Sequence, residues 1–159
     1  MLTTAERQDM VAKIRELPAA IEAAVQDLND VQLNTPYREA GWTVRQVVHH
    51  LADSHLNGFV RTKLILTEER PTLKPYDQDA WASTPDATAM PIQSSLALLR
   101  GLHERLSVLL ESLPESSFGR SAVHPEVGEV TLDGWLATLA RHGENHLTQI
   151  TTLRAAKGW

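Results

Sequence analysis

The chain has 159 residues, of which 42% are hydrophobic, which is enough for one domain with an apolar core. It has no cysteine, which excludes disulfides, thiolate metal sites and a cysteine nucleophile, so a metal would need nitrogen or oxygen ligands. The formal charge of -5, from 20 acidic and 15 basic residues without a basic block, argues against nucleic-acid binding. No stretch approaches the ~20 apolar residues of a membrane span, and the N-terminus lacks the core of a signal peptide. We therefore expect a single cytoplasmic domain over residues 1–159.

The first predicted helix begins after Thr3, which has the spacing of a capping box with Glu6. Apolar residues then recur in steps of three and four, as expected for one buried helical face. Pro18 lies within this stretch and cannot donate a backbone hydrogen bond. A kinked helix would fit, but we favour a short helix followed by a longer one whose first turn contains Pro18. The apolar positions are Val11, Ile14, Leu17, Ile21, Val25 and Leu28.

The second predicted helix runs from about residue 43 to about residue 68. Thr43 and Gln46 form a second capping-box signature. An apolar stripe then continues from Val44 to Leu51 and includes two adjacent histidines.

Residues 70–91 form a long connection that contains four prolines together with Tyr76 and Trp81. A connection of this length is typical of a lid or a binding loop. A third helix follows over residues 92–113, with an apolar stripe in alternating steps of four and three that suits bundle packing. The one polar member of this stripe is His103.

A short two-stranded ribbon is predicted over residues 121–131, because the sequence alternates on both sides of a turn at residues 125–128. Thr131 and Asp133 then open a last helix that extends to near the C-terminus. The predicted fold class is therefore all-α, a four-helix bundle with long connections and a short β-ribbon before the last helix. Sites in such bundles are built from side chains on facing helices.

Two histidines one helical turn apart, His142 and His146, are the strongest chemical signal in the chain. A helix directs both imidazoles to one side, where they can bind one metal ion. Seven histidines in 159 positions would give this spacing by chance in roughly one chain of three. On its own, such a pair is more often two hydrogen-bonded core histidines, so a metal site requires a third ligand.

The third ligand is sought in the second helix, which contains three histidines. His50 lies at the edge of the buried stripe, whereas His55 is rotated well away from it, so His50 is the better candidate. His49 remains a rival that helical position does not separate from His50. Asp53 could accept the spare N–H of either ring and orient it. The alternative for Asp53 is an ordinary carboxylate on the helix surface.

Glu144 lies between the last two histidines but does not form the HExxH motif of zinc proteases. In that motif the glutamate directly follows the first histidine, where this chain has Gly143. Glu144 is rotated by roughly 200° from His142 on an ideal helix, so it is a poor general base for this site. His103 and His124 rank below the three named ligands. His103 is expected to be a buried hydrogen-bonding group or a group that supports a metal ligand, and His124 a loop residue near the mouth of the bundle.

A longer pattern, GWTVRQVVHHLADSH at residues 41–55, closely resembles the signature of the YfiT subgroup of the DinB-like superfamily. The resemblance continues at residues 35–38, 63–68 and 74–77 and ends in the closing HxxxH. It covers nearly the whole chain. It also includes Trp81, SerLeuAlaLeuLeu at 95–99 and HisPro at 124–125.

This resemblance implies a four-helix bundle, commonly dimeric, that holds one zinc or nickel ion with three histidines. The second histidine of the HisHis pair is the ligand in that family, so the resemblance selects His50 over His49. The closing motif supplies His142 and His146. The same resemblance implies a homodimer that acts on a small molecule.

Three neutral imidazoles with an open coordination position would make the ion a Lewis acid, which can lower the pKa of bound water toward ~7. The YfiT-like resemblance thus implies a metal-dependent hydrolase. The alternative is a transferase that activates a low-molecular-weight thiol, such as a bacillithiol-like one, at the metal. A second alternative is a metal-binding module without catalysis.

Four side chains on the second helix and the following connection are candidate contacts for an acidic or sugar-bearing substrate. A solvated surface position fits them equally well from the sequence. They are Arg61, Lys63, Lys74 and Tyr76.

Overall fold

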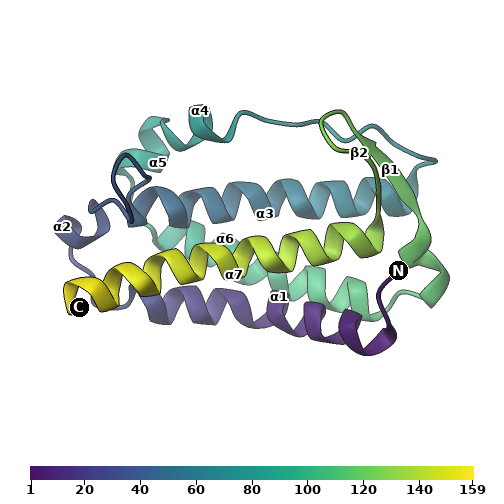
Figure 1. The fold of residues 1–159 in the computed structure, drawn as a ribbon, viewed down its shortest axis with the longest axis horizontal. Coiled ribbons are helices and arrows are strands. Elements are labelled where there is room, and N and C mark those ends of the chain that lie inside the picture. The colour runs from purple at the N-terminus through teal and green to yellow at the C-terminus, as the bar shows by residue number, and fades with distance from the viewer.

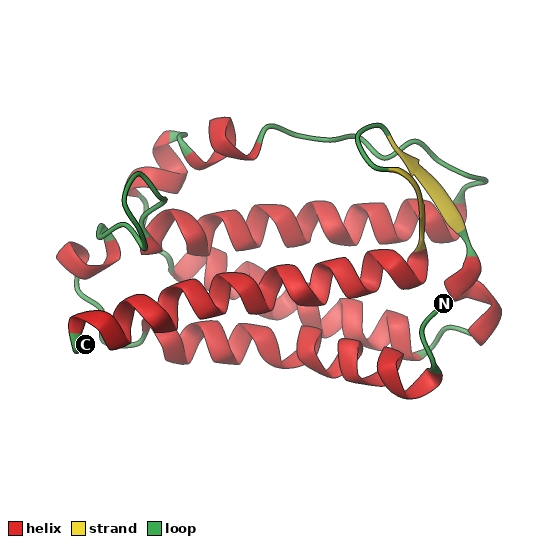
Figure 2. Cartoon of the chain, in the orientation of Figure 1, coloured by secondary structure: helices red, strands yellow, loops and turns green.

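Four long helices form a bundle in the computed structural model, which describes residues 1–159 (Figure 1, Figure 2). Both α1 and α3 pack against α6 and against α7, so α1 and α3 lie diagonally across the bundle. The all-α prediction and the four-helix arrangement are confirmed. The four helices are α1 (Thr4–Val25), α3 (Val44–Thr67), α6 (Gln93–Glu111) and α7 (Leu132–Lys157).

The direction of the helices explains the long connection. Figure 1 shows that α3 and α6 run the same way along the bundle, so the chain between them must return over its whole length. This return carries two short helices, α4 (Gln78–Ala82) and α5 (Pro85–Ala89), which lie over α3. Neither was predicted from the sequence, nor was α2 (Asp30–Leu33), which follows α1.

Side-chain caps fix the starts of the bundle helices as predicted. Thr3 and Glu6 form a reciprocal capping box at α1, and Thr43 and Gln46 form one at α3. The Thr131 hydroxyl accepts a hydrogen bond from the backbone N–H of Gly134 at the start of α7. Each cap satisfies a backbone N–H that the first helical turn leaves without a partner.

The prediction that Pro18 starts a separate helix was wrong, because α1 is one continuous helix with Pro18 inside it. A proline at position 18 leaves the carbonyl of Ile14 without its normal helical donor. The structure supplies another donor, since the Nδ1–H of His103 on α6 binds the Ile14 carbonyl oxygen at 2.5 Å. A side chain from the neighbouring helix thus compensates for the proline.

The predicted ribbon is confirmed as β1 (Ser121–His124) and β2 (Gly128–Thr131), an antiparallel pair in which Ala122 faces Val130. A short 3-10 helix, Glu115–Gly119, precedes it. Val123 also exchanges backbone hydrogen bonds of 2.8 and 2.9 Å with Leu73 and Pro71. The start of the long connection is therefore held against the ribbon.

Hydrogen bonds from α3 hold the far part of the connection. Gln46 donates to the carbonyl of Ala82 at 2.8 Å, and Arg45 donates to the carbonyl of Met90 at 2.6 Å. The segment predicted as a lid is thus tied to the bundle at several points.

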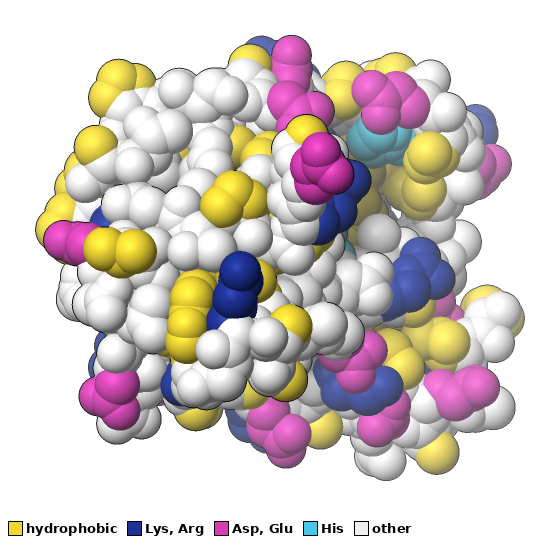
Figure 3. Space-filling model, turned by 60° about the vertical axis from the view of Figure 1, so that its left-hand side comes forward, with side chains coloured by type: hydrophobic (Ala, Val, Ile, Leu, Met, Phe, Trp, Pro, Cys, Tyr) yellow, Lys and Arg dark blue, Asp and Glu magenta, His cyan; other side chains and the backbone are white.

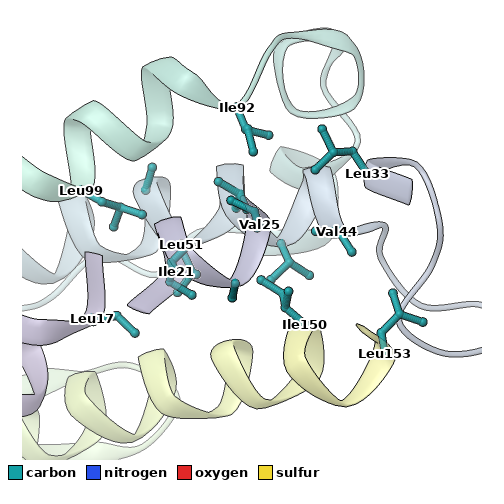
Figure 4. Close-up of a cluster of buried hydrophobic side chains, with 14 residues drawn as sticks. Leu17, Ile21, Val25, Leu33, Val44, Leu51, Ile92, Leu99, Ile150 and Leu153 are labelled. Carbon is teal, nitrogen blue, oxygen red and sulfur yellow. The ribbon is translucent and has the colours of Figure 1, made fainter. Parts of the chain in front are cut away.

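The buried apolar side chains form two clusters, one toward each end of the bundle. Figure 4 shows the cluster that Ile21, Leu51 and Ile150 share with neighbouring residues of α1, α3, α6 and α7. Ile65, Leu106 and other residues form the second cluster near the ribbon. None of the helices combines the length and the apolar character needed to cross a membrane.

Candidate metal centre

Three imidazoles converge where α3 faces α7. The Nε2 atom of His142 lies 3.2 Å from Nε2 of His50 and 3.2 Å from Nε2 of His146. One nitrogen from each ring falls within 4.8 Å of the other two, which makes this a group able to hold a metal ion. The three residues named from the sequence are therefore brought together.

Close packing of α7 against α1 places the two histidines of α7. Gly143 is buried between them, and a Cβ atom there would come within 2.3 Å of Leu17 Cδ2. Glycine at this position lets the two helices approach. The poor helix former next to the candidate ligands thus has a packing reason.

Each ring of α7 has a partner for its second nitrogen. His146 Nδ1 lies 2.8 Å from Gln149 Oε1, which can only accept, so Nδ1 carries the proton and Nε2 presents a lone pair to the centre. His142 Nδ1 lies 3.3 Å from His55 Nε2. Such outer partners fix the tautomer and the orientation of metal-binding histidines.

The sequence placed His55 and Asp53 incorrectly. His55 has no exposed surface and contacts His142, whereas it was expected to be rotated away from the site. A step of five residues turns the helix by about 140°, which still points into the bundle because α6 and α7 cover that side of α3. Asp53 forms no hydrogen bond to a histidine ring, so the orienting groups are His55 and Gln149 instead.

His103 extends the network to the opposite side of the bundle. Its ring stacks on that of His55, with centroids 4.8 Å apart and planes 17° apart. Since Nδ1 of His103 donates to the Ile14 carbonyl, Nε2 is unprotonated in the neutral ring. The expectation of a buried hydrogen-bonding group at His103 is confirmed.

Burial keeps the converging imidazoles neutral. Desolvation and then the neighbouring rings lower the pKa of His50 to about 3, and desolvation with His146 lowers the pKa of His142 to about 4. Desolvation also lowers the pKa of His146, although its hydrogen bond to Gln149 opposes this. Metal ions bind the neutral form of imidazole, so these rings are ready to bind at neutral pH.

Two of the three nitrogen pairs have the spacing expected around one tetrahedral metal ion. Zinc binds imidazole nitrogens at about 2.0–2.1 Å, which at tetrahedral angles separates two nitrogens by about 3.3 Å. The two Nε2 pairs at 3.2 Å are close to that separation. A donor set of three neutral nitrogens suits zinc or nickel better than magnesium or calcium, which prefer oxygen.

The remaining candidates lie outside the cluster. His49 is bound by Ser95 at 2.8 Å and the Met90 carbonyl at 3.2 Å, so its two ring nitrogens are occupied. His124 Nδ1 accepts from the backbone N–H of Glu126 at 3.3 Å. Glu144 forms an ion pair with Lys13 at 3.1 Å, in agreement with the argument against a zinc-protease glutamate.

One aromatic side chain that was not predicted from the sequence, Trp42, covers one side of the site. The centroid of the Trp42 ring lies 4.5 Å from that of the His50 ring. It lies 6.3 Å from the centroid of the His146 ring, and these two rings are nearly parallel. Trp42 stands directly before the capping box of α3, which fixes its position. Its place in the 41–55 pattern was the available signal.

Two cavities reach the histidines. One of about 440 Å³ lies beside Trp42 and His146, and one of about 490 Å³ lies between α3, the start of α7 and the ribbon. Both are lined by His142 and by Gln78 at the start of α4. In Figure 3 the surface is hollowed, with histidine side chains (cyan) at the hollow and lysine or arginine side chains (dark blue) beside it.

The four proposed substrate contacts divide into two pairs. Arg61 and Tyr76 line the larger cavity. Lys63 is exposed and lies over the ring of Phe59 at 5.5 Å, and Lys74 is exposed as well. Only the first pair is placed to approach a ligand in this cavity.

The fold is that of a known class of four-helix bundle proteins. Residues 13–150 match the model of the DinB superfamily, so this chain belongs to that superfamily. In the structure comparison, YfiT from Bacillus subtilis superposes with a TM-score of 0.97 at 42% identity, covering 100% of this chain and 91% of that one. That protein is described as "a probable metal-dependent hydrolase with an unusual four-helix bundle topology".

Sequence relatives carry the same kind of name. "Putative metal-dependent hydrolase GK0616" of Geobacillus kaustophilus is 53% identical over 156 residues, 97% of this chain and 87% of that protein. YfiT of Bacillus subtilis is 44% identical over 155 residues, with the same two shares. TT2238, a four-helix bundle protein, has a TM-score of 0.62 at 18% identity and supports the fold alone.

Proposed function

We propose that this protein is a metal-dependent hydrolase in which His50, His142 and His146 bind one zinc or nickel ion. The convergence of three Nε2 atoms carries this proposal, with two pairs at 3.2 Å. The names of the relatives support it. Structural zinc sites are normally closed by four protein ligands, so three ligands favour catalysis.

The bound ion would supply a Lewis acid that lowers the pKa of water toward neutrality. The chain's own groups prepare that chemistry. Gln149 holds His146 in the tautomer that presents Nε2. With the proton of His142 on Nδ1, His55 Nε2 would accept it and His142 Nε2 would be free for the metal. Trp42 covers His50 and limits the approach of solvent from that side.

A specific observation favours a second candidate, transfer of a low-molecular-weight thiol. The cluster contains only histidines, and no carboxylate joins it as a general base. A thiol has a pKa of about 8.5 and is deprotonated by contact with a metal without a strong base. The small-molecule substrate would then be the thiol and its acceptor.

The first test is the metal content of the purified, tag-free protein, measured by elemental analysis. We expect near-stoichiometric zinc or nickel, and its loss from His142→Ala with helical circular dichroism unchanged. His124→Ala is the matched control, because it removes a histidine outside the cluster and should leave the metal content unchanged. A parent that stays metal-free after reconstitution with both ions would overturn the proposal.

A metal-loaded protein is then assayed with ester and amide substrates, with and without added thiols. Turnover without thiol that is lost in His142→Ala supports the hydrolase. Turnover only with thiol supports the transferase. Tight metal binding without turnover of either kind would favour the non-catalytic module.

A further inference from the structure

The larger of the two cavities beside His142 is lined mostly by side chains that have no part in binding the metal ion. It measures about 490 Å³ and is bounded by α3, the ribbon and the start of α7. His142 lies in its lining, so a molecule bound here would reach the histidine cluster. The cavity is thus placed to hold the body of a substrate while its reacting bond lies at the metal centre.

The charge of this cavity is opposite to that of the whole chain. The chain has 20 acidic and 15 basic residues, yet the cavity is lined by Arg61 and Arg141 and by no aspartate or glutamate. Two acidic side chains lie near enough to affect charges at this cavity, Asp53 near Tyr76 and Glu126 near Arg61. Neither of the two lines the cavity. The neighbouring cavity does contain an acidic residue, Asp79.

Arg61 is held in place by two neighbours. It donates one hydrogen bond to the carbonyl of Lys74, and its guanidinium carbon lies 5.3 Å from the centre of the Trp135 ring. The indole N–H of Trp135 in turn donates to the carbonyl of Gly58 at 3.2 Å. Arg61 is therefore fixed, and it makes no ion pair within the protein. Its other N–H groups remain available for an anion.

Arg141 directly precedes His142 on α7. It is exposed and makes no hydrogen bond or ion pair with the protein. A guanidinium binds carboxylate and phosphate oxygens through paired N–H groups. Arg61 and Arg141 thus give one cavity two guanidiniums that make no ion pair within the protein.

Apolar side chains also line this cavity, beside the polar side chains of Ser54, Gln78 and Thr138. Trp135 and Leu139 of α7 and Val127 and Val130 at the ribbon contribute most of the apolar part. Val127 is 69% exposed at the ribbon turn, which leaves an apolar surface at the mouth of the cavity. The apolar part of the lining suits an aliphatic or aromatic group.

We propose that this cavity selects substrates in which a carboxylate or phosphate is joined to an apolar body. Arg61 and Arg141 bind the anionic group, and the apolar body packs against Trp135, with the reacting bond next to His142. This inference rests on the proposed function, since it assigns a substrate class to the same site.

The test compares 4-phenylbutyrate, its neutral amide and phenyl phosphate as probes. Binding to the full-length protein is measured by nuclear magnetic resonance titration, both metal-loaded and after chelation. Chelation removes direct binding of the anion to the ion. We expect either anion to bind about tenfold more tightly than the amide in both forms, as for a charge-assisted hydrogen bond.

Arg141→Gln is expected to remove most of that preference and leave the affinity for the amide unchanged. Arg61→Gln should act in the same direction. Arg105→Gln is the matched control, because Arg105 lies over the ring of Phe59 and outside this cavity. Equal affinities for acid and amide, or an unchanged preference in Arg141→Gln, would overturn the inference.

The two proposals fail in different ways. If no zinc or nickel binds but the chelated protein still prefers the anions through Arg141, the metal-dependent function is wrong and the anion site stands. If metal binds and is lost in His142→Ala while acid and amide bind equally, the substrate class is wrong and the metal site stands. A carboxylate preference without a phosphate preference would narrow the substrate to a carboxylic acid.

Discussion

The two ends of the bundle and the layer between them are built from different kinds of residues. At each end, all four long helices contribute apolar side chains to one cluster. Between the clusters, α3, α6 and α7 contribute five histidines, His50, His55, His103, His142 and His146. Two buried nitrogens of this layer, His55 Nδ1 and His103 Nε2, have no hydrogen-bond partner. Such buried polar atoms cost stability. We therefore attribute the histidine layer to the proposed function and the ends to folding.

The largest expected effect comes from breaking one of the ends. Ile21 is fully buried in the cluster of Figure 4, and Ile21→Ala should lower the free energy of unfolding by about 2–5 kcal/mol. Urea unfolding measures the loss. Because the ends and the layer have separate roles, the folded variant should still bind metal in the parent's ratio. A large loss of metal at little loss of stability would contradict this division.

Acid should weaken the layer rather than the ends. The pKa of His50 is lowered from 6.5 to about 3 and that of His142 to about 4, so the unfolded chain binds protons that the native protein does not. The stability that these two neutral rings contribute is fully present above about pH 6.5. It is lost progressively as the pH falls from about 6.5 toward the lowered pKa values. The metal-free protein should therefore unfold at a lower urea concentration at about pH 5 than at about pH 7.5.

The matched variant for this pH effect is His50→Gln. It removes one of the lowered groups, so the acid-induced drop in the urea midpoint should be smaller than in the parent. Carboxylates contribute to acid unfolding in both proteins and cancel in the comparison. An equal drop in the two proteins would mean that His50 is protonated as easily in the native state as in the unfolded chain.

A glycine inside the layer should tolerate substitution less well than a glycine outside it. A Cβ at Gly143 would meet Leu17 at 2.3 Å, whereas one at Gly101 on the exposed side of α6 would meet nothing within 4 Å. We expect Gly143→Ala to cost about 1–3 kcal/mol through overpacking. Gly101→Ala should instead add about 0.5–1 kcal/mol through helix propensity. Thermal unfolding of both variants tests the contrast, and a neutral Gly143→Ala would show that α1 and α7 can separate at no cost.

The ends of the bundle were more predictable from the sequence than the connections. Steps of three and four residues and the capping boxes at Thr3 and Thr43 located the long helices, because these signals are local. The short helices α4 and α5 were missed, since each has only five residues and is held by contacts from α3. The unbroken α1 was also missed, because the donor that compensates for Pro18 comes from a helix 85 residues away in the chain, at His103.

The three histidines of the candidate site could be predicted from the sequence, but the side chains that contact them could not. The HxxxH spacing indicated His142 and His146, and the family resemblance selected His50 over His49. The partners of the rings could not be inferred in the same way. Asp53 was chosen by its spacing, but contacts with His55 depend on how α3, α6 and α7 pack, which no local pattern specifies.

The smallest expected effect concerns His103. It tests whether this side chain supports the candidate metal centre or stabilises α1 through its hydrogen bond to Ile14. His103→Leu leaves the Ile14 carbonyl without its donor and should cost about 1–3 kcal/mol. Pro18→Ala restores a backbone N–H that can bind the same carbonyl within α1. In that background His103→Leu should cost about 1 kcal/mol less, which urea unfolding of the four proteins measures as a coupling energy. A coupling of this sign, with metal content unchanged in His103→Leu, would assign His103 to the support of α1, whereas equal costs in both backgrounds would leave its hydrogen bond to Ile14 without a role in stability.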